Sequence, residues 1–94
     1  MTKPKKSLYP EQHERLGKIL AAARKSQKLR QRQLADRIRR PQTFVAKFEA
    51  GKRQLDVIEF VTVAKAIGVD PRRIITRLLK RWPEMPPESE SPPE

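Results

Sequence analysis

Residues 31–50, QRQLADRIRRPQTFVAKFEA, decide how this chain is expected to fold. Apolar residues recur at the spacing of one helix face over residues 31–38, which predicts a short helix there. Pro41 interrupts that pattern, so we expect the next helix to begin near it. That helix is expected to end before Gly51, because glycine readily adopts the left-handed backbone that follows many helices. The stretch therefore predicts two short helices joined by a tight turn.

The helix expected after Pro41 has two different faces. Val45 and Phe48 lie on one face and are expected in a hydrophobic core. Small or hydrogen-bonding side chains lie on the opposite face: Gln42, Thr43, Ala46, Lys47 and Ala50. Such a face can enter a DNA major groove, which is about 12 Å wide, and a glutamine can donate to and accept from adenine at once. The candidates for base reading are Gln42, Thr43, Ala46 and Lys47.

The flanking sequence predicts further helices. One begins near Pro10, because proline suits the first helical turn. Its apolar stripe consists of Leu16, Ile19, Leu20 and Ala23. Another runs from a cap at Asp56 to about Ile67 and ends at Gly68. We expect its inner face to consist of Val57, Phe60, Val61, Ala64 and Ile67.

The last predicted helix opens at Asp70-Pro71, a cap followed by a first-turn proline, and reaches about Arg81. It carries a broad apolar stripe: Ile74, Ile75, Leu78, Leu79 and Trp82. This stripe either closes the core of the monomer or leaves an exposed patch of the kind that marks an interface. We favour a homodimer whose interface is formed by Ile75, Leu78, Leu79 and Trp82.

Alternating strand patterns and hairpin turn signals are missing from the sequence. The predicted fold class is therefore all-α, with five helices in one domain over residues 10–82. Residues 1–9 are expected to form a flexible basic arm. Residues 83–94 hold five prolines and four glutamates, which predicts a disordered acidic tail with almost nothing to bury. This tail either aids solubility or screens the basic face against weak, nonspecific DNA.

Charge is spread unevenly along the chain. Lys and Arg number 22 against 11 Asp and Glu, a formal net charge of +11. Residues 24–53 alone hold eleven cations and two acids. A field of this size attracts polyanions but does not choose among them. The basic face therefore indicates nucleic-acid binding, and its alternative is a solvated surface that aids solubility.

The chain lacks the residues that several classes of protein function require. The chain has no cysteine, no cluster of metal ligands, no glycine-rich phosphate loop and no nucleophile–base pair. We therefore expect no metal, no cofactor and no enzyme activity. No run approaches the roughly 20 apolar residues that span a bilayer, and the first ten residues lack the apolar segment of a signal peptide. We expect a cytoplasmic protein that does not bind membranes.

Three segments resemble the lambda-repressor/Cro-type (XRE) helix-turn-helix family. They are LRQRQLADRI (29–38), RPQTFVAKFEAGKRQLD (40–56) and VAKAIGVDP (63–71). The resemblance spans residues 15–79 and four helices in order. It implies a lambda-repressor-like fold that binds the major groove of double-stranded DNA, usually as a dimer, and that usually regulates transcription. The lysines of the N-terminal arm resemble the lysine-rich arm of lambda repressor: Lys3, Lys5 and Lys6.

The resemblance also implies contacts to the DNA backbone. Gln31 occupies the family position that contacts a phosphate and often supports the first glutamine of the recognition helix, here Gln42. The other backbone contacts are expected from Arg32, Arg39, Arg40, Lys52 and Arg53. Contacts of this kind set register and affinity but read no sequence directly.

Two positions of the turn depart from the family pattern. The position that is usually glycine is Arg39, and a left-handed arginine there costs on the order of 1 kcal/mol. The next position is often apolar, but here it is Arg40, which we expect to point outward. Phe44 either packs against the scaffold or touches a sugar-phosphate edge, and we favour packing. Glu49 is expected to form a structural ion pair with an arginine of the first helix rather than to act in catalysis.

The sequence thus favours a sequence-specific transcriptional regulator, a dimeric repressor of the phage or prophage type on an inverted-repeat operator. The alternative is an antitoxin, or a regulator controlled by an acidic partner protein that binds the same basic face. Copurification of a small acidic protein would favour the alternative.

Overall fold

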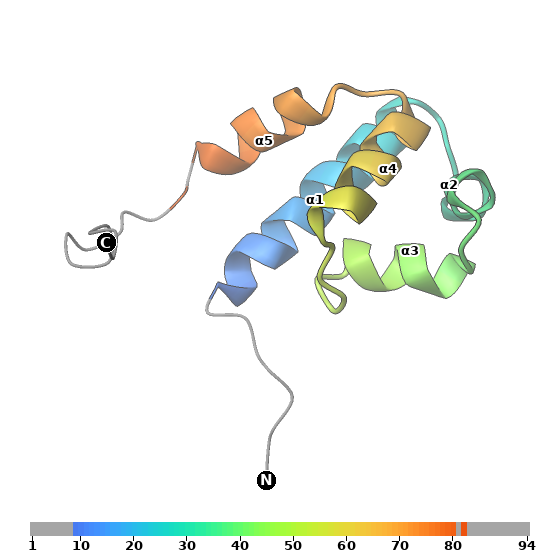
Figure 1. Cartoon of the computed structure of the whole chain (residues 1–94), viewed down its shortest axis with the longest axis horizontal. Helices are drawn as coiled ribbons and strands as arrows, with labels where there is room; N and C mark the ends of the chain where they lie inside the picture. The colour runs from blue at the N-terminus through green and yellow to red at the C-terminus, as the bar shows by residue number, and fades with distance from the viewer. Residues whose placement is uncertain (1–8, 81, 83–94) are drawn as a thin grey trace, which may run out of the picture.

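The computed structural model describes residues 9–80 and Trp82, and within them the chain forms five helices and no strand (Figure 1). The helices are α1 (Pro10–Ser26), α2 (Gln31–Ile38), α3 (Gln42–Glu49), α4 (Val57–Ile67) and α5 (Pro71–Leu79). The predicted all-α class is confirmed, and α2 and α3 are the two short helices expected from the central stretch.

Two predicted segments fall largely outside this description. The basic arm was expected over residues 1–9, of which only Tyr9 is described. The acidic tail, residues 83–94, lies outside the described residues.

Local sequence signals set where α4 and α5 begin. The Asp56 carboxylate accepts the N–H of Glu59 at 2.7 Å, and the Glu59 carboxylate accepts the N–H of Asp56 at 3.0 Å. This reciprocal pair is a capping box, which satisfies two N–H groups that have no partner inside the helix. At α5, Asp70 accepts the N–H of Arg72 at 2.9 Å, and Pro71 occupies the first helical position.

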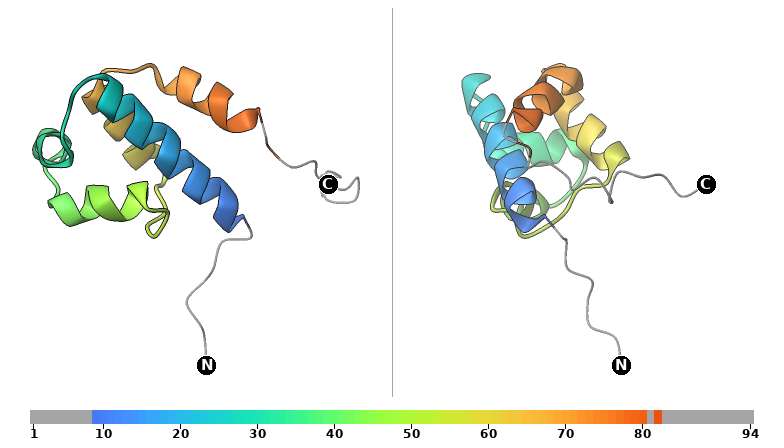
Figure 2. Two further views of the ribbon diagram at one scale, coloured as in Figure 1. Left: turned by 180° about the vertical axis from the view of Figure 1, so that it is seen from behind. Right: turned by 90° about the vertical axis from the view of Figure 1, so that its left-hand side faces the viewer.

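The α2–α3 pair lies at one end of the domain, and α5 lies at the opposite end (Figures 1 and 2). Helix α1 contacts both α3 and α5, while α2 contacts α3 and α4. The Tyr9 ring before α1 and the Trp82 ring after α5 have centroids 6.0 Å apart. The two short helices are therefore carried by a scaffold that consists of α1, α4 and α5.

Each helix contributes one side to a single core. The largest fully buried side chains are Leu20, Leu34, Val45, Phe48, Val63 and Ile74. A chain of this length can bury only a modest core, so close packing between the helices matters. Gly17 of α1 is one such place, because a Cβ atom there would overlap the backbone carbonyl of Phe48 and lie 2.8 Å from the carbonyl oxygen of Glu49. Only glycine allows α1 and α3 to approach this closely.

Two arginines hold helix ends against neighbouring helices. Arg15 of α1 donates to the carbonyls of Leu78 at 2.8 Å and Arg77 at 3.1 Å, at the C-terminal end of α5. Arg37 of α2 donates to the carbonyl of Ala66 at 2.8 Å, near the end of α4. A cation is favourable there because the last carbonyls of a helix carry partial negative charge. Part of the positive charge of the chain is therefore structural.

The predicted inner face of α4 is wrong at one position. Val57 is 72% exposed, whereas Val63, which was not expected on the inner face, is 1% exposed. Most residues of α4 are apolar, so the spacing of apolar residues does not fix which of them face inward. The predicted end of the last helix near Arg81 also differs, since α5 ends at Leu79 with Lys80 as its C-cap, and Arg81 lies outside the described residues.

Candidate nucleic-acid interface

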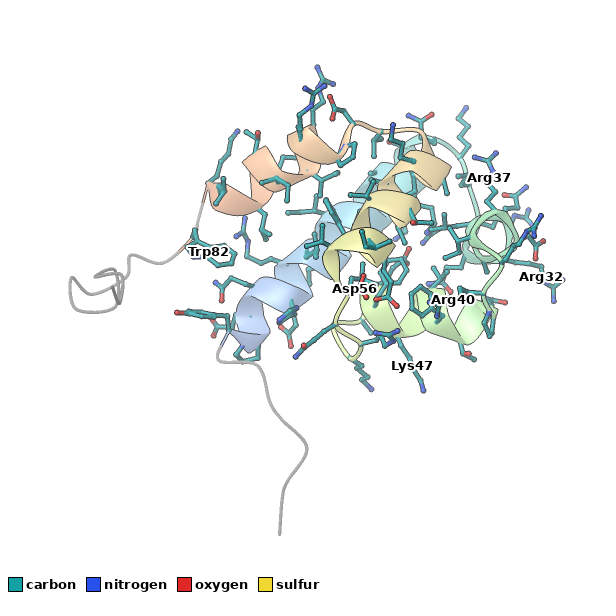
Figure 3. All side chains as sticks on the ribbon, viewed as in Figure 1. Arg32, Arg37, Arg40, Lys47, Asp56 and Trp82 are labelled. Atoms are coloured by element: carbon teal, nitrogen blue, oxygen red, sulfur yellow. The ribbon has the colours of Figure 1, made fainter. Side chains whose placement is uncertain are left out.

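Helix α3 turns its polar face to solvent. Gln42, Thr43 and Lys47 are exposed and Ala46 is half-buried, whereas Val45 and Phe48 are buried in the core as predicted. Lys47 points away from the domain in Figure 3. The outward face is therefore open to a ligand over its whole length, which meets the geometric requirement for insertion into a groove.

A buried ion pair connects α3 to α1. Arg24 Nε donates to Glu49 Oε2 at 2.7 Å, and a second N–H of the same guanidinium donates to Oε1 at 3.0 Å. The two side chains are only 8% and 7% exposed. Arg24 also donates to the carbonyl of Leu29, at 2.7 Å, in the connection between α1 and α2. The structural ion pair expected for Glu49 is confirmed, and it joins α1, α3 and the segment before α2.

The ion pair continues into a hydrogen-bonded chain that ends at the first residue of α3. Gln31 Nε2 donates to Glu49 Oε1 at 2.9 Å, and Gln42 Nε2 donates to Gln31 Oε1 at 3.4 Å. A carboxylate can only accept, so Gln31 must turn its amide nitrogen toward Glu49 and its oxygen toward Gln42. Gln42 must then turn its own nitrogen toward Gln31. Its Oε1 and its second N–H remain available on the outward side.

The turn between α2 and α3 holds two of the predicted backbone contacts. Arg39 has φ 59° and ψ 45°, so the left-handed conformation expected at this position is present despite the bulky side chain. Arg39 and Arg40 are both exposed, and Arg32 projects outward from α2 (Figure 3). These side chains lie on the same end of the domain as the outward face of α3.

A second cluster lies on the other flank of α3. Arg40 and Arg53 both donate to Glu59 Oε2, at 3.2 Å and 2.8 Å, and both guanidinium carbons lie over the Phe44 ring, at 4.5 Å and 5.0 Å from its centroid. Phe44 is buried and meets Phe48 edge-on, which confirms the expected packing role. Glu59 was not among the residues expected to matter from the sequence. Its position three residues after Asp56 is the capping-box spacing that could have identified it.

The electrostatics of this cluster favour the ionised carboxylate. The hydrogen bond from the Asp56 N–H lowers the pKa of Glu59, and the neighbouring Arg53 lowers that pKa further, against the opposing effect of burial. Glu59 is therefore charged at neutral pH and can hold both arginines. Lys52, in the loop after α3, is exposed and has no ion pair within residues 9–80 and Trp82.

The predicted dimer residues lie on α5 or just after it, far from α3 in the fold. Ile75 is 40% exposed, Leu79 is 57% exposed and Trp82, just beyond the helix, is 37% exposed, while Leu78 is half-buried. Val57 and Ile58 at the start of α4 are also strongly exposed. Of the stripe predicted for α5, only Ile74 closes the core, and the rest leaves apolar surface in solvent.

Among residues 9–80 and Trp82, no group of three or more histidine, cysteine, aspartate or glutamate residues could hold a metal ion. No helix in this part of the chain is long and apolar enough to cross a membrane.

Comparisons with known proteins place this geometry among helix-turn-helix proteins. The family model HTH_3, described as helix-turn-helix, matches residues 20–74. The structure is similar to that of an XRE-family like protein from Pseudomonas syringae pv. tomato str. DC3000, with 37% sequence identity and a TM-score of 0.73. That match covers 81% of this chain and 93% of the other. No curated protein matches the chain.

Two further structures are similar at lower identity and support the fold alone. One is the restriction-modification controller protein C.AhdI from Aeromonas hydrophila, with 22% identity, a TM-score of 0.68, and coverage of 72% of this chain and 99% of that one. The other is the clp gene regulator ClgR from C. glutamicum, with 19% identity, a TM-score of 0.70, and coverage of 83% of this chain and 94% of that one.

The buried ion pair gives a test of the scaffold. Glu49→Ala would leave Arg24 buried without its partner, so we expect the free energy of unfolding to fall by about 3–5 kcal/mol. Asp36→Ala is the matched control, because Asp36 is an exposed acid with no ion pair in the described part of the chain. Its effect should stay within about 0.5 kcal/mol. If urea denaturation shows the same decrease in the free energy of unfolding for both variants, the structural role of Glu49 is contradicted.

Proposed function

The chain belongs to the XRE family of helix-turn-helix proteins, and from that premise we propose that it is a sequence-specific regulator of transcription that inserts α3 into the DNA major groove. Members of this family are typically DNA-binding regulators. The finer proposal is a dimeric repressor that occupies an inverted-repeat operator and acts in the cytoplasm.

The orientation of the Gln42 amide is the observation that carries this proposal. Its nitrogen is directed at Gln31 by the chain of hydrogen bonds from Glu49, which leaves one acceptor and one donor side by side on the outward face. Adenine presents the complementary pair, the N6 donor and the N7 acceptor, in the major groove. The contact to Gln31, at 3.4 Å, favours this orientation of the Gln42 amide and so reduces the rotamer freedom that both contacts would cost. We therefore propose that Gln42 reads adenine.

The rest of the outward face fits close approach to bases. Thr43 offers a hydroxyl and a methyl group, and Lys47 can reach the acceptors of guanine. Ala46 keeps the helix surface low between them. The proposed phosphate contacts flank this face: Gln31, Arg32, Arg39, Arg40, Lys52 and Arg53. Because phosphates occur at every step of the duplex, these contacts would supply affinity and register rather than sequence preference.

We propose that α5 provides the dimer interface. Ile75, Leu79 and Trp82 leave apolar surface in solvent at the end of the domain opposite α3. Exposed apolar patches of this kind often mark interfaces. A twofold dimer built there would carry two α3 helices on the same side of a duplex, about 34 Å apart, which is one turn of DNA.

If Gln42 reads a base, two variants should differ in how their affinities for operator DNA and for random duplex change. Gln42→Ala should weaken binding to the cognate operator by about 1–3 kcal/mol more than binding to random duplex, because it removes a base contact. Lys52→Ala should weaken both about equally, because it removes a phosphate contact. Fluorescence anisotropy titrations at one fixed salt concentration measure both. The same decrease on both DNAs for Gln42→Ala would rule out base reading by this residue.

The dimer proposal predicts a change of mass. Leu79→Glu places a charge in the exposed apolar surface of α5. Leu79 is not part of the buried core of the monomer. We expect the wild-type chain to sediment as a dimer at micromolar concentration and the variant to sediment as a monomer that keeps the helical circular dichroism signal of the folded chain. Lys80→Gln, which lowers the net charge by the same single unit at an exposed residue beside this surface, is the control. A wild-type chain that is monomeric at all concentrations would refute the interface.

A further inference from the structure

The cluster at Arg40, Phe44, Arg53 and Glu59 brings two cations to one oxygen atom. Both guanidinium groups donate to Glu59 Oε2, and both guanidinium carbons lie over the Phe44 ring, within 5.0 Å of its centroid. Arg53 additionally donates to the carbonyl of Gln54. Two long side chains from separate loops are thus fixed at one place, although each is still about 40% exposed, at 43% for Arg40 and 39% for Arg53.

The cluster lies beside the outward face of α3. Gln42 contacts Gln31 on one flank of α3, and Phe44 carries Arg40 and Arg53 on the other flank. In Figure 3, Arg40 lies across α3 on the side where α4 begins, while Lys47 points outward beneath the helix. A helix that enters a major groove has one sugar-phosphate backbone on each side of it. The cluster therefore lies where one of these two backbones would pass.

Both arginines retain N–H groups for a ligand. Within the described residues, Arg40 uses one terminal nitrogen, and Arg53 uses its two terminal nitrogens, for the contacts given above. A guanidinium has five N–H donors in a fixed planar fork. Arg40 therefore keeps its Nε and its other terminal nitrogen, and Arg53 keeps its Nε. Planar donors of this kind match the oxygens of a phosphate.

Simple addition of charge does not explain a phosphate site here. The two arginines are accompanied by two carboxylates, those of Glu59 and Asp56, so the local sum is near zero. Three of the four carboxylate oxygens are, however, already engaged: Asp56 Oδ1 with the N–H of Glu59, Glu59 Oε1 with the N–H of Asp56, and Glu59 Oε2 with the two arginines. The cluster would attract an anion through the arrangement of its free N–H groups.

We propose that Arg40 and Arg53 form one preorganised site for a phosphate of the DNA backbone, with Glu59 as its positioning residue and Phe44 as its platform. The proposal rests on the DNA-binding function proposed above and assigns an acidic residue a favourable part in it. An arginine that is held in place loses less rotamer freedom on binding than a free one. Glu59 thus favours binding by ordering its partners, although its own charge repels phosphate.

Glu59→Gln tests this proposal because it separates positioning from capping. The amide oxygen of glutamine can still accept the N–H of Asp56, and glutamine is as suitable as glutamate in a capping box. The amide no longer offers a charged acceptor to the two arginines. We expect operator and random duplex to bind about fivefold more weakly, the size of one exposed ion pair. We also expect the slope of log affinity against log salt to become shallower by roughly 0.9 for each phosphate that the variant no longer neutralises.

A matched charge change distinguishes positioning from plain electrostatics. Asp36→Asn removes one negative charge from an exposed residue of α2 that has no ion pair in the described chain. It should leave DNA affinity unchanged or raise it. If Glu59→Gln also raises affinity, or leaves the salt slope unchanged, the proposal is overturned.

A charge-conserving variant keeps the test decisive if Glu59→Gln proves unstable. Arg53→Lys retains the positive charge but removes the planar fork. We expect it to bind duplex about fivefold more weakly, as the removal of one exposed ion pair would, with the same unfolding midpoint. Wild-type affinity in Arg53→Lys would overturn the proposal. A wild-type chain that binds no duplex would instead refute the proposed function itself.

Discussion

The buried ion pair between Arg24 and Glu49 is the contact on which the geometry of the α3 surface depends. Burial of two charges costs free energy that their attraction roughly offsets, so the main effect of the pair is on orientation rather than stability. Arg24 fixes both carboxylate oxygens, and Oε1 then admits only the nitrogen of Gln31. The orientation passes to Gln42 at the start of α3. A contact inside the scaffold thus determines which hydrogen-bonding groups face outward.

The arginines of this chain have two different roles: some hold the helices together, and others remain exposed near α3. Arg24 is buried, and Arg15 and Arg37 bind the carbonyl ends of α5 and α4. These cations hold the helices together and are not free to bind a polyanion. The net charge of +11 therefore overstates the positive surface around α3. What remains there is arranged on two flanks of one helix, and this arrangement, more than the total charge, suits a grooved polyanion.

The starts of α1 and α5 and the end of α4 could be predicted from sequence because they depend on local signals. Proline at position 10, the Asp70-Pro71 pair and glycine at position 68 each act through the backbone next to them. The inner face of α4 could not be predicted at Val57 and Val63, because eight of its eleven residues are apolar and more than one choice of inner face fits their spacing. Gly17 contacts α3, and Glu59 contacts Arg40 as well as its local capping partner. The spacing of apolar residues carries no signal for such contacts between residues distant in the sequence. The site residues on α3 were placed on the outward face as predicted, but their part in DNA binding stays a prediction.

Selection of bound sequences from a random duplex library, at near-physiological salt, tests the central claim most directly. If an oriented Gln42 on a symmetric pair of α3 helices reads bases, the selected pool should contain an inverted repeat. Its half-sites should be centred about 10–10.5 base pairs apart, with adenine at a fixed position in each. A pool that remains random after repeated rounds, although the protein is folded and binds the duplexes, would contradict the account.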